Sequence, residues 1–195
     1  VLTVQKGYSS IFHKNGGNAS YSAMANTMRG IYGTDVLIAA ANSFTGSVRQ
    51  AEYTKKEAAA MVMPNGLRSY RCEMTGAELK ETVKAFVEGY EGGLPVFNRG
   101  SLPVVSGIAI EVQENGGSYT LTGVTRNGQP VQDDDTFTVS CLSTPKYMEP
   151  LLADGSCAFE EEENTVRNAW LDYVSAGSAL LAEPESYIVL RDENG

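Results

Sequence analysis

The segment from Asn42 to Arg49 holds the residue types best suited to gripping a phosphate. It reads Asn-Ser-Phe-Thr-Gly-Ser-Val-Arg and follows an apolar run, Asp35 to Ala41, that predicts a buried strand. Small residues let backbone amides approach a ligand, and a guanidinium can bind phosphate through two N–H groups. Loops held by rigid structure often carry ligand groups, so this loop is the first candidate site. A solvent-exposed arginine after a turn is the alternative.

The only histidine of the chain is His13. Phosphatase-type dinuclear metal sites draw on several histidines, and this sequence cannot supply them. His13 also lacks any recognisable triad context, which favours a structural or solvent-exposed histidine over a catalytic one. We therefore expect no catalytic residue and no metal site in this chain.

Three cysteines, Cys72, Cys141 and Cys157, do not have the spacing of a zinc site. Their odd number leaves at least one free thiol. A Cys141–Cys157 disulfide is conceivable in an oxidising compartment, although the sequence does not establish it.

The charge balance argues against two classes of partner. The 195 residues carry 15 Lys and Arg against 24 Asp and Glu, a net charge of −9, which disfavours nucleic acid and anionic membranes but not a small anionic ligand. The acidic runs 133–135 and 160–163 predict solvated loops rather than calcium sites. No apolar run is long enough to span a bilayer, and residues 1–6 lack the features of a signal peptide. We therefore expect a mature or trimmed fragment without membrane insertion.

Helices and strands are interleaved along the chain. Helical periodicity with capping signals at Asn18, at Thr54 and at the Thr75/Glu78 pair predicts the helices, and β-branched or alternating runs bounded by turn residues predict the strands. Asn127-Gly128 is a tight-turn signal. The pattern predicts an α+β class with mixed sheets packed against helices. The expected helices are 17–32, 55–61, 76–91 and 165–174, and the expected strands are 35–41, 67–74, 104–112, 119–125, 136–142 and 187–190.

The order of these features resembles the C-terminal domain of the 5′-nucleotidase family, which includes UDP-sugar hydrolases and 2′,3′-cyclic-nucleotide phosphodiesterases. Six short motifs in the family's order carry the resemblance over about 175 residues. They are Gly17-Asn18 with Ala23-Met24, Asp35 to Ile38 followed by Asn42 and Arg49, Pro64 to Leu67 with Met74 to Leu79, Val105 to Ile108, Gly128 to Val131, and Val166 to Tyr173.

The resemblance implies a substrate-binding domain over residues 17–195, preceded by an N-terminal linker over 1–16. In that family an N-terminal metallophosphatase domain of the same polypeptide carries two divalent metals, and the C-terminal domain binds the nucleotide. The ligand implied here is a nucleotide or a related phosphate ester. The location implied is extracellular, cell-surface or periplasmic.

The resemblance also assigns candidate substrate-binding residues: Asn42 and Arg49 on the phosphate loop, Arg68 as a helper, Tyr147 against the base and Asp154 at the ribose. The chain departs from the family pattern in three ways. The interval from Asn42 to Arg49 is longer, an aromatic residue is replaced by Asn65, and an arginine before Gly17 is missing.

These departures keep an alternative open. The domain would then have lost nucleotide binding and would serve as a scaffold or surface-interaction module, or its parent would act on a different ester. If the nucleotide site is retained, Phe44 or Tyr70 could replace the missing aromatic residue. That the chain is itself a hydrolase is the least favoured reading.

Overall fold

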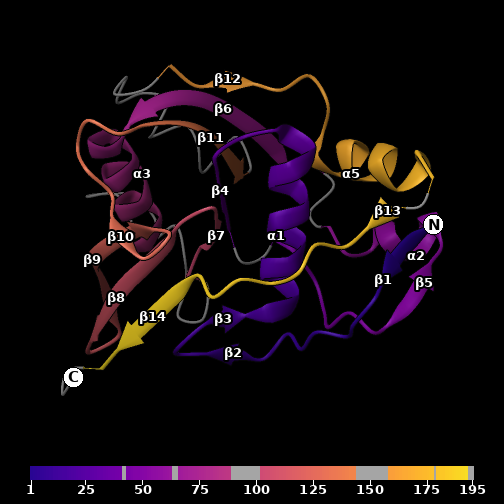
Figure 1. The fold of residues 1–195 in the computed structure, drawn as a ribbon, viewed down its shortest axis with the longest axis horizontal. Helices are drawn as coiled ribbons and strands as arrows, with labels where there is room; N and C mark the ends of the chain where they lie inside the picture. The colour runs from indigo at the N-terminus through magenta and orange to yellow at the C-terminus, as the bar shows by residue number, and fades with distance from the viewer. Residues whose placement is uncertain (41–42, 63–65, 89–101, 144–157, 178, 193–195) are drawn as a thin grey trace.

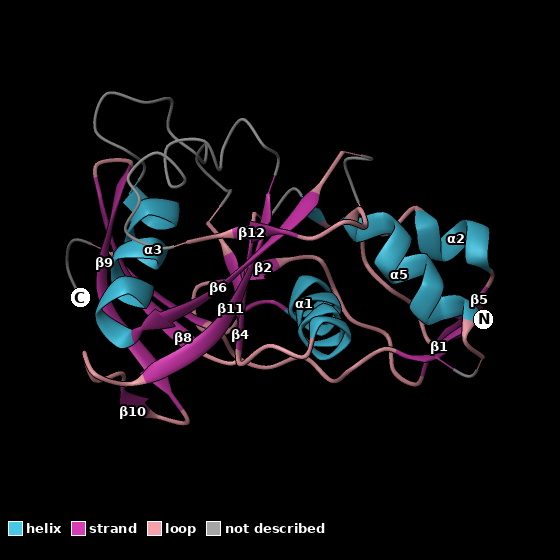
Figure 2. Ribbon diagram, turned by 90° about the horizontal axis from the view of Figure 1, so that it is seen from above, coloured by secondary structure: helices cyan, strands magenta, loops and turns pink. Residues whose placement is uncertain are grey.

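A five-stranded sheet lies at the centre of the molecule, between helix α3 on one side and helix α1 on the other (Figure 2). The computed structural model describes residues 1–40, 43–62, 66–88, 102–143, 158–177 and 179–192. The strand order in this sheet is β12-β6-β11-β4-β7. The bounds are Glu160–Glu161 for β12, Arg68–Thr75 for β6, Thr136–Ser143 for β11, Val36–Ala39 for β4 and Val104–Ser106 for β7.

Because of the strand directions, the ends of two strands and the beginnings of two others lie on the same side of this sheet. Strands β4 and β11 are parallel, and β6 and β7 run antiparallel to them. The pairing sets Arg68 opposite Ser143 and Val104 opposite Ala39. We call this side, where β4 and β11 end and β6 and β7 begin, the loop edge.

Both long helices begin with the caps that the sequence predicts. Helix α1 spans Ala19–Tyr32, and the side chain of Asn18 accepts a hydrogen bond from the backbone of Tyr21 at 3.0 Å. Helix α3 spans Gly76–Glu88, and the Thr75 hydroxyl and Glu78 carboxylate form the expected capping box. The apolar face of α1 packs on β4 and β7, while α3 packs on β6, β11 and β9.

A second sheet has the order β10-β9-β8-β14, with β10 Gln129–Pro130, β9 Ser118–Arg126, β8 Ala109–Asn115 and β14 Ile188–Arg191. The sequence predicts one strand over 104–112 with an irregularity at its glycine. That prediction is wrong, because the chain leaves the first sheet at Gly107 and enters the second at Ala109. Gly107 has φ +83°, and a Cβ there would lie 2.1 Å from the carbonyl oxygen of Asp35. The turn at Asn127-Gly128 is confirmed, with positive φ at both residues.

A smaller lobe, which contains the N-terminus, lies beyond α1 from the second sheet (Figure 1). Its sheet has the order β13-β1-β5, with β13 Ala179–Leu180, β1 Leu2–Val4 and β5 Ala51–Tyr53. Helices α2, Lys55–Ala59, and α5, Val166–Ser175, pack on each other there. The fully buried Trp170 joins them by donating from Nε1 to the carbonyl of Ala58 at 2.9 Å. Residues 1–16 thus contribute β1 to this lobe and also contain β2, Phe12–His13, which pairs with β3, Gly17–Asn18.

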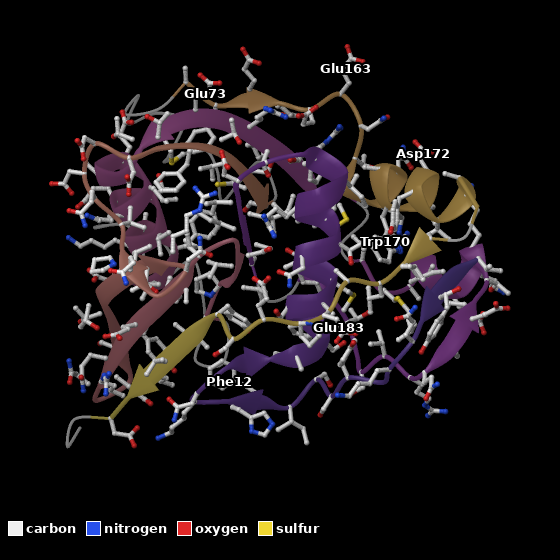
Figure 3. The ribbon with its side chains drawn as sticks, viewed as in Figure 1. Phe12, Glu73, Glu163, Trp170, Asp172 and Glu183 are labelled. Carbon is white, nitrogen blue, oxygen red and sulfur yellow. The ribbon has the colours of Figure 1, made fainter. Side chains whose placement is uncertain are left out.

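The chain between β13 and β14 runs along α1, as Figure 1 shows in yellow. Ser22 and Asn26 on α1 donate to the carbonyls of Glu185 and Glu183 at 2.8 and 2.7 Å. The amide of Ala182 donates to the Thr27 hydroxyl at 2.9 Å. Figure 3 shows Glu183 beside α1. The polar side chains on this face of α1 therefore form hydrogen bonds with the segment between β13 and β14 rather than with solvent.

A Cys141–Cys157 disulfide, which the sequence left open, is excluded. Cys141 is a fully buried free thiol in β11, whereas Cys72 in β6 is disulfide-bonded. Cys157 lies outside the described residues. Burial strongly raises the pKa of the Cys141 thiol, so it is protonated and unreactive at neutral pH.

The acidic runs are exposed, as expected, except for the half-buried Glu162, and Glu160 and Glu161 form the short strand β12 rather than a loop. In the described part of the chain, no group of three or more His, Cys, Asp or Glu side chains could hold a metal ion. No helix within it is long and apolar enough to cross a bilayer.

Candidate functional site

The strands that precede or contain the residues proposed for ligand binding end or begin at the loop edge. Asn42 follows β4, Arg68 begins β6, and both Tyr147 and Asp154 follow β11 in the chain. Asn42, Asn65, Tyr147 and Asp154 themselves lie outside the described residues. Arg49 and Arg68 are the two candidates whose surroundings the structure gives.

The loop from Ser43 to Arg49 is anchored through an aromatic contact. The Phe44 ring is 1% exposed and lies 6.1 Å from the ring of Tyr21 in the first turn of α1. The Thr45 amide donates to the Met61 carbonyl at 3.1 Å. Phe44 is therefore a core residue, and Tyr70 is equally buried at 2%. The hypothesis that either ring stacks on a base is wrong, because neither presents a free face.

Arg49 lies on the exposed surface just before β5. Its amide donates to the hydroxyl of Tyr53 at 2.6 Å, which fixes the backbone but leaves the side chain outside this contact. Among the described residues, no ion pair to the Arg49 guanidinium is present. The side chain is therefore available to an anion.

Arg68 is half-buried and already engaged. Its Nε lies 3.5 Å from a carboxylate oxygen of Glu161, and its Nη1 is 3.5 Å from the carbonyl of Glu163. An anionic ligand would have to compete with Glu161 for this guanidinium. Arg68 begins β6 of the five-stranded sheet, whereas Arg49 lies just before β5 of the small lobe, so different sheets position these two arginines.

His13 is exposed on β2 and pairs with Gly17 through the backbone. Of the two placements expected for His13, structural or solvent-exposed, the structure shows the exposed one.

An aromatic cleft of about 410 Å³ lies next to the loop edge. Four aromatic side chains from separate segments line it, together with Lys14 from the β2–β3 hairpin and Leu102 just before β7. Sequence reasoning missed this cleft because its residues are scattered from one end of the chain to the other. The aromatic residues are Phe12, Tyr21, Tyr119 and Tyr187.

Because Gly17 has no side chain, the ring of Tyr187 can lie against it and line the cleft. It has φ +84°, and a Cβ there would lie 2.3 Å from Cζ of Tyr187. The Tyr187 hydroxyl accepts a hydrogen bond from the amide of Asn18 at 3.1 Å. Burial raises the pKa of Tyr187 to about 12, so the hydroxyl is protonated at neutral pH. The Gly-Asn pair noted in the sequence is the local signal that could have pointed to this contact.

Lys14 sits at the rim of the aromatic cleft, where it forms an ion pair with Asp192. The hydrogen bond to Asp192 raises the pKa of Lys14, which is exposed and positively charged. Two first-turn amides of α1, those of Ser20 and Tyr21, are not free for an anion, because they donate to the Ser9 carbonyl and the Asn18 side chain. A negative group bound here would be met by side chains rather than by the helix end.

A more polar cleft of about 350 Å³ lies at the other end of β4 and contains Arg29, Asp35 and Arg126. A carboxylate oxygen of Asp35 accepts from the amide and hydroxyl of Thr138 at 3.0 and 2.9 Å, and the other accepts from Arg126 at 3.1 Å. These hydrogen bonds, above all that from the Thr138 amide, lower the pKa of Asp35. These groups form hydrogen bonds with one another, which is typical of a structural link between strands rather than of a ligand site.

Comparisons with known proteins agree with this fold. The family model described as the 5′-nucleotidase C-terminal domain matches residues 9–145. A search of curated proteins finds no match. Similar solved structures include a 5′-nucleotidase precursor from Thermus thermophilus (TM-score 0.70, 13% identity) and the NAD nucleotidase of Haemophilus influenzae (0.67, 16%). The sulfate thiohydrolase SoxB from Thermus thermophilus is also similar (0.66, 13%).

These similarities cover nearly all of this chain, at 98%, 98% and 97%, but only part of the other chains, at 39%, 38% and 34% respectively. The chain therefore spans about two fifths of the length of the first two structures. At such low identity the likeness establishes the fold alone.

Proposed function

Because the chain belongs to the family of 5′-nucleotidase C-terminal domains, we propose that it is the substrate-binding part of a 5′-nucleotidase-like phosphohydrolase. Its ligand is a nucleotide or a related phosphate ester. The catalytic partner is an N-terminal metallophosphatase domain of the same polypeptide. The solved nucleotidases of this fold are long enough for such a partner, since they extend well beyond the part matched here.

The loop edge is the observation that carries this proposal. Two parallel strands end there and two others begin there. The proposed ligand residues lie at these strand ends or, in the sequence, in the segments that follow them. Ligand groups commonly lie on loops held by a rigid sheet. Arg49 holds the phosphate, with Asn42 on the same loop and Arg68 as a helper. Tyr147 stacks on the base, and Asp154 accepts the ribose hydroxyls.

The two divalent metals of such an enzyme belong to the partner domain in this proposal. A dinuclear phosphatase site needs several histidine and carboxylate ligands close together. This chain has one histidine, and its described residues contain no cluster of three candidate ligands. The described residues do not fit that metal site, so the contribution of this chain is binding rather than chemistry.

The compartment proposed is extracellular, cell-surface or periplasmic. The disulfide at Cys72 supports it, because structural disulfides persist in oxidising environments.

Calorimetric titration with AMP, adenosine and UDP-glucose tests the proposed function. The wild type binds AMP, and Arg49→Ala weakens AMP binding about tenfold or more, since a charge-assisted hydrogen bond is worth roughly 1.5–3 kcal/mol. Adenosine binding, which involves no phosphate, is unchanged in this variant. The control is Lys84→Ala, which removes an exposed cation from α3 and should leave every affinity as in the wild type.

A second candidate function is a scaffold or interaction module that no longer binds nucleotides, or a domain whose parent acts on another ester. Two observations at the site favour it: Arg49 is not among the residues that line the aromatic cleft, and Arg68 is held by Glu161. A sulfate thiohydrolase also shares the fold. If calorimetry detects no binding heat at millimolar AMP and UDP-glucose, the result would favour the scaffold or interaction module over the nucleotide-binding domain.

A further inference from the structure

We propose that Tyr53 is a positioning residue for Arg49, whose backbone it fixes so that the guanidinium is ready to bind the phosphate of the ligand. The inference rests on the proposed function, because it explains how the phosphate-binding side chain assigned there is held. Tyr53 ends β5 in the small lobe, and its ring is half-buried against the hydrophobic core. Its hydroxyl reaches back along the chain to Arg49.

The Tyr53 hydroxyl makes two hydrogen bonds to the same residue. The amide of Arg49 donates to this hydroxyl at 2.6 Å, and the hydroxyl donates to the carbonyl of Arg49 at 3.2 Å. In an antiparallel ladder, a residue exchanges the same pair of bonds with the residue opposite it. The tyrosine hydroxyl therefore does for Arg49 what the backbone of a neighbouring strand would do.

Arg49 lies in a short gap between two backbone pairings. On one side, Val48 and Tyr8 exchange two backbone hydrogen bonds at 2.8 and 3.1 Å. On the other side, β5 forms an antiparallel pair with β1. Within the described residues no strand pairs with Arg49 itself. The Tyr53 hydroxyl is therefore the group that fixes the backbone at this position, while the flanking residues are held independently of it.

A fixed backbone matters for a long side chain that binds an anion. Ordering a flexible segment at the moment of binding opposes association, so a ligand is bound more tightly when the segment is already ordered. The two bonds from Tyr53 involve only backbone atoms of Arg49, and the Arg49 side chain is exposed. Its guanidinium can thus form paired hydrogen bonds with phosphate oxygens while its backbone stays in place.

The small lobe contains a second tyrosine with the same pattern of bonds. The Tyr173 hydroxyl donates to the carbonyl of Leu180 at 2.7 Å and accepts from the amide of Leu180 at 3.2 Å. Tyr173 is also half-buried against the core, in helix α5. Leu180 is not one of the proposed ligand residues. Removal of the Tyr173 hydroxyl is therefore a matched control for removal of the Tyr53 hydroxyl.

Calorimetry on the purified 195-residue chain with AMP and adenosine tests the inference. Tyr53→Phe removes the hydroxyl and keeps the ring. It should weaken AMP binding about threefold to tenfold, the effect of a typical hydrogen bond, and leave adenosine binding unchanged. Tyr173→Phe should leave both affinities as in the wild type. Thermal unfolding verifies that both variants are folded.

A double-mutant cycle separates positioning from a general structural role. If Tyr53 acts through Arg49, its hydroxyl has nothing left to position once the guanidinium is removed. Tyr53→Phe should then weaken AMP binding in the wild-type background but not in the Arg49→Ala background. A general loss of structure would instead lower the affinity for AMP in both backgrounds.

The outcomes also separate this inference from the proposed function. Wild-type AMP affinity in Tyr53→Phe, together with weaker binding in Arg49→Ala, would overturn the positioning role and leave the proposed function intact. An equal loss in Tyr173→Phe, or the same loss in both backgrounds of the cycle, would overturn the positioning role as well. If the wild type does not bind AMP, the proposed function fails, and this inference fails with it.

Discussion

At the scale of single residues, the contact between Gly17 and Tyr187 shows how one position without a side chain shapes a cleft. The backbone of Gly17 is in the left-handed region, and the Tyr187 ring occupies the space where a Cβ would be. Any other residue would meet both backbone strain and a clash with a buried ring.

Gly17→Ala should therefore lower the free energy of unfolding by about 2–4 kcal/mol, the sum of the strain and overpacking effects. Urea denaturation followed by circular dichroism measures it. Gly33→Ala is the matched control, because Gly33 also has positive φ, +60°, but has open space around its Cβ position. Gly33→Ala should lower the free energy of unfolding by about 1–2 kcal/mol. Equal stability of the two variants would contradict the role given to the ring.

The candidate site is only partly predictable at this scale. The sequence singles out Arg49, which the structure leaves without an ion pair among the described residues, but the burial of Phe44 and Tyr70 follows from contacts with distant elements that no local pattern encodes. The aromatic cleft escapes sequence analysis for the same reason, since Phe12 and Tyr187 meet only through the pairing of the first and last parts of the chain.

At the scale of elements, Asp35 ties the start of β4 to its neighbour β11. Its carboxylate accepts from Thr138 and Arg126, and its amide donates to the Thr138 carbonyl at 2.9 Å. The lowered pKa of Asp35 means that the ionised form is the one the fold stabilises.

Asp35→Asn should therefore destabilise the protein at pH 7 by about 1–2 kcal/mol. The folded pKa is below the unfolded value, so this contribution is complete above the unfolded pKa and is lost as the pH falls through the folded pKa. Urea unfolding at pH 7 and in acid measures the difference in free energy of unfolding between wild type and variant. Asp134→Asn, in an exposed turn, is the control. A gap that is as large in acid as at pH 7 would contradict the account.

Long elements are predicted well because they carry their own signals. Caps and periodicity locate α1 and α3, and β-branched runs locate β4 and β11. The two- and three-residue strands, such as β1, β2 and β13, have no periodicity of their own and exist only through their partners. The switch between sheets at Gly107 resembles an irregularity within one strand, because the sequence does not say that the two halves pair with different neighbours.

At the scale of the whole molecule, the cysteines report how the sheet and the surrounding chain are joined. Cys72 in β6 is disulfide-bonded, and Cys141 in β11 is free and inaccessible. The sequence could not pair them correctly, because pairing depends on distances that only the assembled sheet determines.

Thiol titration with Ellman's reagent tests this state. The chain, isolated without reductant, should show one reactive thiol after denaturation and three after reduction. The folded protein should show none that reacts rapidly, since burial raises the pKa of Cys141. Three thiols in the denatured, unreduced protein would contradict the disulfide and remove the support it gives to an oxidising compartment.

The most direct measurement of the central claim is an amide chemical-shift titration of the ¹⁵N-labelled chain with AMP. Binding at the loop edge predicts that the largest shifts occur at Ser43 to Arg49, at Arg68 and at Ser143. Saturable shifts confined to these residues would support a substrate-binding domain. Shifts centred on Arg29 and Arg126, or no shifts at millimolar AMP, would contradict it.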